Sequence, residues 1–146
     1  LMDVVSIPLI KKNYRVVPRK NGFILEEIPE KYAKIKPCRV VGKRLTLGGL
    51  VQITLHDGAT VLTDKDVNVN DTVVLETPKR NLKEVIPMAV GNHAVVFRGR
   101  HRGEKGVVKE ITKGSAARKS LTTVGEFQTL TEYVLITGKD KPLIDL

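Results

Sequence analysis

Short apolar runs separated by turn residues recur along the whole chain, and this rhythm restricts the folds that the chain can adopt. The dipeptides Asn21-Gly22, Gly48-Gly49 and Asp57-Gly58 each separate two such runs, and dipeptides of this kind favour tight turns between antiparallel strands. In the clearest run, Leu50–His56, apolar and polar residues alternate as they do in a strand with one buried face. The sequence shows no apolar heptad repeat. We therefore predict an all-β protein built from barrel-like sheets.

The sequence predicts two β units, residues 1–89 and 90–146, and one short helix. The helix is expected at Pro29–Lys34, since proline suits the first helical position and Pro37 stops the helix. The boundary is placed near Met88–Asn92, where a more basic part of the chain begins. The expected strands are, in chain order, Asp3–Leu9, Asn13–Pro18, Phe23–Ile28, Arg39–Leu47, Leu50–His56, Ala59–Leu62, the end of Val67–Glu76, Leu82–Met88, Val90–Phe97, Gly106–Lys113, Lys119–Val124, Glu126–Leu130 and Tyr133–Thr137.

Positive charge is concentrated in one segment of a basic chain. The formal net charge is +9 and the pI is about 9.8. Ala94–Lys119 contains eight Lys or Arg residues and two acids, a net +6, whereas Val124–Leu146 contains two bases and four acids, a net −2. Clustered cations attract polyanions through their long-range field and through counterion release. This distribution points to a nucleic-acid partner.

Glycines and cations alternate between the two apolar runs of Ala94–Ile111, which reads AVVFRGRHRGEKGVVKEI. Gly99, Gly103 and Gly106 would let the loop curl and present its backbone N–H groups, arginine and lysine suit phosphate oxygens, and His101 could hydrogen-bond a phosphate or a ribose. A solvated loop is the alternative, but the uniform sign favours RNA contact. The predicted RNA-binding residues are Arg98, Gly99, Arg100, His101, Arg102, Gly103, Lys105, Lys109, Lys113, Arg118 and Lys119, with Lys43 and Arg44.

A second basic set lies in the first unit, and two interpretations of it stay open. Glu26, Glu27 and Glu30 accompany it, so a charge-mixed solvated face and an RNA surface fit equally well. Lys43 and Arg44 are the preferred second contact, because they lie beside the next expected turn. The set consists of Lys11, Lys12, Arg15, Arg19, Lys20, Lys31, Lys34, Lys36, Arg39, Lys43 and Arg44.

Catalysis, metal binding and cofactor binding are not predicted. Cys38 is the only cysteine, which excludes an intramolecular disulfide and a cysteine-based zinc site and favours a reduced, cytosolic setting and a buried apolar position. His56-Asp57 places a base beside an acid, but adjacent strand residues face opposite sides and no nucleophile is evident. We expect no small-molecule substrate and no membrane partner, since the chain has no phosphate-binding enzyme motif and no bilayer-length apolar run.

Aromatic residues make up 4% of the chain, and none is tryptophan. Proteins that read single-stranded RNA usually stack bases on aromatic rings. The aromatic residues fall on apolar positions of the expected strands, which places them in the core, so we expect recognition of folded RNA through shape, phosphates and 2′-hydroxyls. The residues concerned are Tyr14, Phe23, Phe97, Phe127 and Tyr133.

The loop and its flanks carry a resemblance to a known motif. This segment resembles the KOW motif of ribosomal and transcription-elongation proteins. The residues that carry the resemblance are Val95, Gly99, Arg102-Gly103, Gly106-Val107 and Ile111. The chain is also similar to the archaeal and eukaryotic small-subunit ribosomal protein family S4e in a series of segments. In chain order these are LMDVVSIP, Asn13-Tyr14-Arg15, KPCRVVGK, VQITLHDGATV, VNVNDTV and FQTLTEYVLITGKDKP. The match extends over essentially the whole chain.

This resemblance implies a domain order and a partner. The family has a helical RNA-binding domain, then a central β domain, then an SH3-like KOW barrel, so we expect the chain to begin just after the helical domain. The implied role is that of a cytoplasmic ribosomal component that binds small-subunit ribosomal RNA and neighbouring ribosomal proteins, and the ending soon after Gly138–Pro142 favours an archaeal source. A KOW-type elongation protein, with a different domain before the loop, and an adaptor that grips an acidic peptide are the alternatives.

Overall fold

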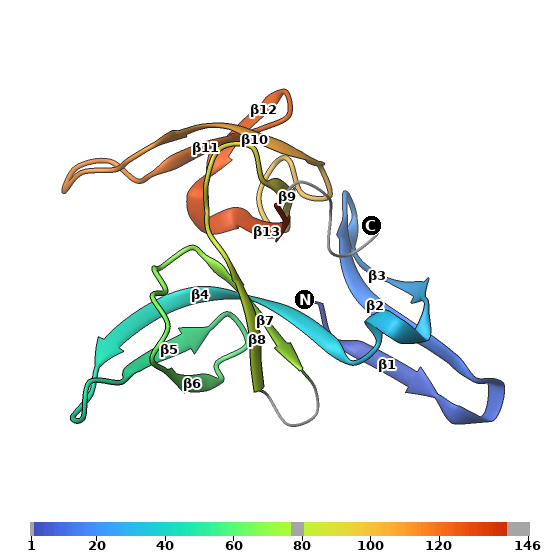
Figure 1. Ribbon diagram of the computed structural model, residues 1–146. Helices are drawn as coiled ribbons and strands as arrows, with labels where there is room; N and C mark the ends of the chain where they lie inside the picture. The colour runs from blue at the N-terminus through green and yellow to red at the C-terminus, as the bar shows by residue number, and fades with distance from the viewer. Residues whose placement is uncertain (1, 77–80, 140–146) are drawn as a thin grey trace.

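Antiparallel β-sheet accounts for nearly all of the regular structure. The computed structural model describes residues 2–76 and 81–139, apart from the side chain of Lys31 (Figure 1). Over these residues thirteen strands form three antiparallel sheets, in the orders β1-β2-β3, β6-β5-β4-β7-β8 and β12-β11-β10-β9-β13. The predicted all-β class is confirmed. Of the predicted chain ending, Gly138–Pro142, residues 140–142 lie outside the described part.

The first sheet is a three-stranded arm beside the other two sheets (Figure 1). Its strands are β1 (Val4–Ile7), β2 (Lys12–Arg19) and β3 (Gly22–Ile28). The β2–β3 turn is the one that Asn21-Gly22 predicted. The β1–β2 hairpin also forms as expected, and its connection is a 3-10 turn, η1 (Pro8–Ile10), followed by Lys11 with a φ of 52°.

The short helix predicted at Pro29–Lys34 is present only as a single 3-10 turn, η2 (Glu30–Tyr32). Pro29 keeps an extended backbone and β4 begins at Ile35, so the connection is too short for a second turn. A helix of this length makes too few hydrogen bonds to offset its nucleation. In the part of the chain that the structure describes, no helix has the length and apolar character needed to cross a membrane.

The second sheet curls because its longest strand changes partners midway. The strands are β4 (Ile35–Leu45), β5 (Val51–Leu55), β6 (Thr60–Thr63), β7 (Thr72–Glu76) and β8 (Asn81–Ile86). Ile35–Arg39 pairs with β7 and Val40–Leu45 pairs with β5, with a bulge between Val40 and Gly42. Bulges bend a strand and increase its twist. Pro37 lies inside β4, so the strand begins before the predicted Arg39.

The third sheet repeats this construction. Its strands are β9 (His93–Val96), β10 (Lys105–Thr112), β11 (Leu121–Val124), β12 (Phe127–Leu130) and β13 (Val134–Gly138). A 3-10 turn, η3 (Thr131–Tyr133), joins β12 to β13. Lys105–Val107 pairs with β9 and Val108–Thr112 pairs with β11, with a bulge between Val108 and Glu110. All five strands expected after residue 89 are therefore present.

Buried apolar residues join the second and third sheets. One cluster of fully or nearly fully buried side chains contains Ile35, Val74, Ile86, Ala94, Val96, Val108, Val124, Val134 and Ile136. A second cluster lies within the second sheet and includes Cys38, which is 0% exposed, as expected of a small apolar residue. Met2, Val95, Phe97 and Leu135 form a third cluster under the arm. The sheets of the two predicted units therefore pack against each other.

Candidate nucleic-acid interface

The loop between β9 and β10 is held in shape by its own backbone. Gly99 and Gly103 have φ values of 86° and 92°, which L side chains rarely adopt. The N–H groups of Arg102, Gly103 and Glu104 donate to Gly99, Val96 and His101 respectively, at 3.3, 2.8 and 3.1 Å. The glycines therefore curl the loop as predicted, but these three N–H groups are used internally, so the expectation that they are presented to a phosphate is wrong for them.

The loop is also docked onto the turn between β2 and β3. A Cβ placed on Gly103 would lie 2.8 Å from the backbone nitrogen of Lys20, so only glycine allows this approach. The Arg102 guanidinium donates to the Lys20 carbonyl oxygen at 3.2 Å. Gly106 differs from the prediction, because it lies in β10 without a positive φ and instead allows Gly125 to approach closely. The arm thus fixes the position of the loop.

One ring face of His101 is covered. The His101 and Phe127 rings stack with their centroids 4.5 Å apart and an interplanar angle of 29°. Phe127 belongs to β12, at the opposite edge of the third sheet from β13. His101 therefore orients the loop over the sheet, and the ring face that stacks on Phe127 is not available to a ligand.

A groove of about 720 Å³ runs between the second and third sheets. Four cationic residues border it: Arg39 on β4, Arg98 in the β9–β10 loop, and Arg118 and Lys119 before β11. Among the described residues that line it, Glu132 is the only acid, and its Oε1 lies 3.3 Å from the Lys119 Nζ. The remaining lining residues are Val41, His56, Val69, Asn70, Phe97, Gly114, Ser115, Ser120, Thr131 and Tyr133.

A smaller cavity of about 260 Å³ continues this groove toward the arm. It is lined by Phe23, His56, Phe97, Arg98 and Arg102, of which His56, Phe97 and Arg98 also line the groove. The Arg98 guanidinium carbon lies 5.9 Å from the centroid of the Phe97 ring, close enough for a cation–π contact. The two hollows form one basic channel that extends over all three sheets.

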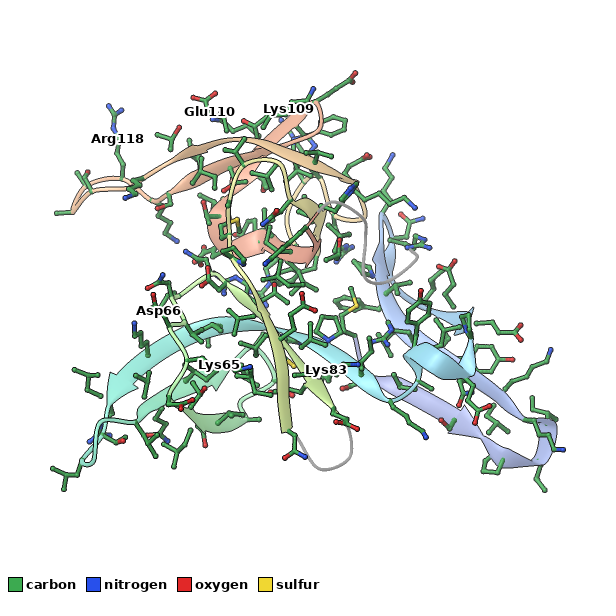
Figure 2. The ribbon with its side chains drawn as sticks, in the orientation of Figure 1. Lys65, Asp66, Lys83, Lys109, Glu110 and Arg118 are labelled. Atoms are coloured by element: carbon green, nitrogen blue, oxygen red, sulfur yellow. The ribbon has the colours of Figure 1, made fainter. Side chains whose placement is uncertain are left out.

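The structure brings only some of the predicted RNA-binding residues to this channel. Arg98, Arg102, Arg118 and Lys119 border it, and Figure 2 shows the Arg118 side chain, like that of Lys109, projecting from the outer side of the third sheet. The bulge in β10 leaves Lys109 and Glu110 both exposed on that side. The exposed predicted cations that line neither hollow are Arg100, Lys105, Lys109, Lys113, Lys43 and Arg44.

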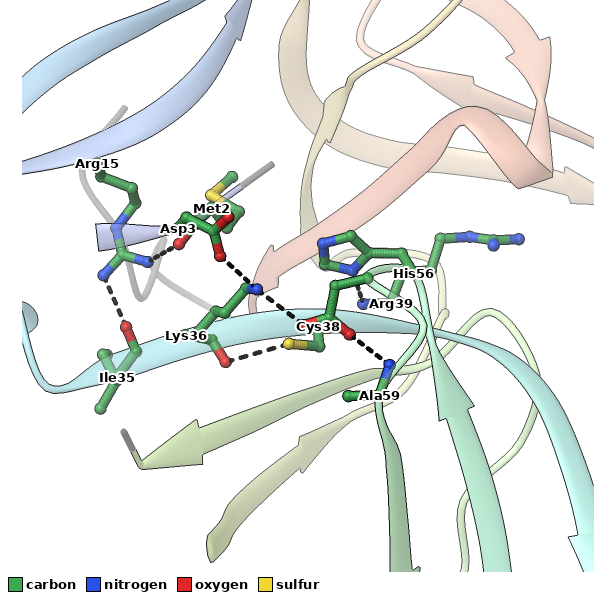
Figure 3. A network of polar contacts seen from close by, with 10 residues as sticks. Met2, Asp3, Arg15, Ile35, Lys36, Cys38, Arg39, His56 and Ala59 are labelled. Carbon is green, nitrogen blue, oxygen red and sulfur yellow. Dashed lines mark hydrogen bonds and ion pairs between the residues drawn. The ribbon is translucent and has the colours of Figure 1, made fainter. Parts of the chain in front are cut away.

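Arg39 was assigned to the second basic set, yet it lies in the channel and only 7% of its surface is exposed. Its guanidinium donates to the Asn70 Oδ1. Its backbone N–H donates to the His56 Nδ1 at 3.0 Å (Figure 3). Burial lowers the pKa of Arg39, and the nearby cation of Arg98 lowers it further. The carboxylate of Glu132 acts in the opposite direction but does not outweigh the burial. In the sequence Arg39 interrupts the apolar run PCRVV, which is the one local sign that it has a special position.

Arg15 is fully buried, so it is not part of any RNA surface. Its guanidinium donates to the carbonyl oxygens of Met2 and Ile35 at 3.0 and 2.9 Å (Figure 3). It also donates to the Tyr32 carbonyl oxygen at 2.7 Å. Burial lowers the pKa of Arg15 to about 10. The residue therefore ties the arm to the start of β4, and nothing in the sequence distinguished it from the exposed cations around it.

Lys36 is paired as well. Its Nζ lies 2.5 Å from the Asp3 Oδ1 and 2.8 Å from the Asp57 Oδ2, and only 12% of its side chain is exposed (Figure 3). Burial alone would lower the pKa of Lys36, but the hydrogen bonds to the two carboxylates outweigh it and raise the pKa. Asp57 therefore holds a lysine and the Ala59 N–H, which fits the prediction that His56-Asp57 is not a catalytic pair.

The rest of the second basic set is mixed. Arg19 pairs with Glu26, and the Lys12 Nζ lies 3.9 Å from the Glu27 Oε2, as the charge-mixed interpretation expected. Lys11, Lys20 and Lys34 are exposed, and the side chain of Lys31 lies outside the described part. Phe23 was predicted to be core, but it is 50% exposed and lies on β3, the edge strand of the arm.

A curled antiparallel β protein with a basic channel between its sheets presents the kind of charged surface that extended polyanions recognise. Among the described residues, no group of three or more His, Cys, Asp or Glu side chains is arranged to hold a metal ion. The sequence model of the ribosomal protein family S4e matches residues 10–82. The chain belongs to this family.

Individual relatives agree with this assignment. The small ribosomal subunit protein eS4 of Methanocella arvoryzae is 39% identical over 99% of this chain and 63% of its own length. The eS4 protein of Methanothermobacter thermautotrophicus is 39% identical over 99% of this chain and 62% of its own length. The chain thus spans less than two thirds of these relatives. The crystal structure of the 30S ribosomal protein S4e from Thermoplasma acidophilum superimposes with a TM-score of 0.83 and 28% identity, covering 95% of this chain and 72% of that one.

Family membership settles two of the earlier expectations. The family match lies before the β9–β10 loop, in the segment where an elongation protein was expected to carry a different domain, so that alternative is wrong. A family of ribosomal proteins also confirms the prediction that the chain is not an enzyme.

Proposed function

We propose that this chain is a structural constituent of the small ribosomal subunit, located in the cytoplasmic ribosome, and that its basic channel binds ribosomal RNA. The observation that carries the proposal is the convergence of Arg39, Arg98, Arg102 and Lys119 from three separate chain segments on one channel, whose described lining residues include a single acid. Its relatives bear the name small ribosomal subunit protein eS4. Neighbouring ribosomal proteins are the second class of partner.

Two sheets that pack through a shared apolar cluster form the walls of the channel. The proposed units, residues 1–89 and 90–146, each supply one wall, with Arg39 on the first and Arg98 and Lys119 on the second. A double-stranded RNA backbone presents rows of phosphates, which arginine and lysine neutralise without reading sequence. The channel would therefore hold an RNA segment by shape and charge.

The predicted cations outside the channel form two further proposed contacts. Arg100 belongs to the β9–β10 loop and Lys105 begins β10, while Lys109 lies on the outer side of β10 and Lys113 follows the end of that strand. Lys43 and Arg44 lie at the far end of β4, beside the β4–β5 turn. These groups can contact RNA only if it extends past the channel, so their effect on binding should be smaller than that of Arg98.

The test is binding of the chain to purified small-subunit ribosomal RNA at a series of salt concentrations. We expect affinity to fall linearly with salt on logarithmic axes, and Arg98→Ala to reduce that slope by about one unit for each phosphate that the arginine neutralises. Lys65→Ala and Lys83→Ala are matched controls, because both lysines are exposed, line neither hollow (Figure 2) and should leave the slope unchanged. Binding without salt dependence, or displacement of RNA by an acidic peptide, would contradict the proposal and favour the adaptor.

A further inference from the structure

The small cavity beside the arm combines flat rings with cations, and charge neutralisation alone does not need such a combination. Phe23 comes from β3, His56 from the end of β5, and Phe97 with Arg98 and Arg102 from the β9–β10 loop. Residues from all three sheets therefore converge on a space of about 260 Å³. This volume lies below the range of about 300–1,000 Å³ of pockets that enclose drug-sized ligands, so the cavity suits one planar ring system.

The surrounding structure holds these rings in place. Phe97 is 9% exposed and its N–H donates to the Tyr133 carbonyl oxygen at 3.0 Å. The His56 Nδ1 accepts the hydrogen bond from the Arg39 N–H, which fixes the ring orientation. Phe23 is paired in register with Pro18 and remains 50% exposed. An aromatic ring left half in water beside an open cavity is a surface that a second ring can cover.

The cations at the cavity edge define the chemistry of the occupant. Arg98 lies against the Phe97 ring, and Arg102 is anchored to the Lys20 carbonyl oxygen while its buried Nε has no hydrogen-bond partner. None of the five described lining residues is acidic. A ligand with a flat ring and an attached anion satisfies both features, and a nucleotide has this composition.

We propose that this cavity receives one unpaired nucleobase of the bound RNA, stacked on the half-exposed ring of Phe23, with its flanking phosphates at Arg98 and Arg102. The inference rests on the proposed function and deepens it. The chain then recognises a paired RNA segment interrupted by an extruded nucleotide, where the duplex lies along the groove and the extruded base enters the cavity. This revises the sequence-based expectation that base stacking contributes little.

The test uses two RNA hairpins that are identical except for a single unpaired 2-aminopurine nucleotide in one of them. We expect the chain to bind the bulged hairpin about 5- to 100-fold more tightly, the range typical for stacking of one base on an aromatic side chain, and the 2-aminopurine fluorescence to be quenched on binding. Equal affinity for the two hairpins, or fluorescence that binding leaves unchanged, would overturn the inference.

Variants of β3 separate stacking from general apolar contact. Phe23→Ala should reduce the affinity for the bulged hairpin to that for the paired one, and Phe23→Tyr should retain the preference because it keeps the ring. Leu25→Ala is the matched control, since Leu25 lies on the same strand, is 55% exposed and does not line the cavity. If Leu25→Ala weakens binding as much as Phe23→Ala, or if Phe23→Ala weakens both hairpins equally, the cavity is not a base site.

The same measurements keep the inference distinct from the proposed function. Salt-dependent binding of the paired hairpin with no advantage from the bulge would sink the inference and leave the RNA-binding function standing. Failure of both hairpins and of small-subunit RNA to bind in a salt-dependent way would sink the function, and the inference with it. Displacement of the bulged hairpin by an acidic peptide containing phenylalanine, but not by adenosine monophosphate, would identify a protein-docking site instead.

Discussion

The cations of the first 45 residues and those of the β9–β10 loop look alike in the sequence but have different roles in the structure. Arg15 and Lys36 are buried or paired and hold the arm against the second sheet. Arg98 and Arg100 are exposed, and Arg98 lines both hollows of the channel. A buried cation contributes to stability through the acceptors that surround it, while an exposed one contributes little to stability and is available to a ligand. Burial and acceptors, rather than residue type, separate the two groups.

The largest loss of stability is expected for a substitution at Arg15, and it tests the difference between buried and exposed cations. Arg15→Met would leave three carbonyl oxygens, two buried and one partly buried, without the arginine donor, which we expect to lower the free energy of unfolding by about 3–5 kcal/mol. Arg98→Met is the matched change at an exposed arginine and should cost less than about 0.5 kcal/mol. Urea unfolding monitored by circular dichroism measures both. Equal costs would show that the two groups do not differ as described.

Gly103→Ala should have the next largest effect, because it disrupts the contact between the β9–β10 loop and the β2–β3 turn of the arm. The substitution introduces a side chain at a φ of 92° and a Cβ 2.8 Å from the Lys20 nitrogen, and we expect a loss of about 2–3 kcal/mol. Gly48→Ala is the control, since Gly48 has a φ of 89° but a Cβ there would meet no atom within 4 Å, so only the backbone cost of about 1 kcal/mol remains. Thermal unfolding compares them. A loss no greater than that of Gly48→Ala would mean that the loop is not docked on the arm.

Lys36→Met tests the paired lysine and should cost about 1–2 kcal/mol at neutral pH. The hydrogen bond from Lys36 lowers the pKa of Asp3. Burial alone would raise the pKa of Asp57, but the hydrogen bond from Lys36 helps to outweigh burial, so the pKa of Asp57 is lowered too. A carboxylate with a lowered pKa stabilises the folded state above the pKa of the unfolded chain, about 3.9, and this contribution is lost as the pH falls through the folded value. The raised pKa of Lys36 adds stability that is lost above about pH 10.5.

The measurement is the free energy of unfolding from pH 2 to pH 7 for the wild type and Lys36→Met. We expect the wild type to lose more stability than the variant as the pH falls below about 4. Protonation of Asp3 and Asp57 removes their interaction with Lys36, and the variant does not have this interaction to lose. Parallel curves would show that the pair of carboxylates does not depend on Lys36.

The smallest effect distinguishes two arginines of the loop itself. Arg102→Ala removes the hydrogen bond to the Lys20 carbonyl and should cost about 0.5–1.5 kcal/mol, whereas Arg100→Ala should leave stability unchanged within about 0.5 kcal/mol. Chemical denaturation resolves the difference. If Arg100→Ala is the more destabilising of the two, the assignment of roles within the loop is wrong.

Local pattern was sufficient to predict most of the strands. Alternation and turn dipeptides act over a few residues, and they located β5, the β2–β3 turn and every strand of the third sheet. The contacts that build the candidate site join distant residues. Arg102 meets Lys20 across 82 positions, and Arg39 reaches the channel only because β4 curls beneath the third sheet. Phe23 was wrongly assigned to the core. The residue pattern around it indicates a strand, but it does not show that this strand lies at the edge of a sheet.

The apolar cluster between the second and third sheets has a mechanical consequence for the encounter with RNA. Separating the channel walls would expose Val74, Ile86, Val96 and Ile136 to water together, and each such side chain costs about 1.5–3 kcal/mol to solvate. The spacing of Arg39 from Arg98 is therefore set before any ligand arrives. If RNA binds in the channel as proposed, it would have to adjust its grooves to walls of fixed spacing, and RNA segments of another width would bind less tightly.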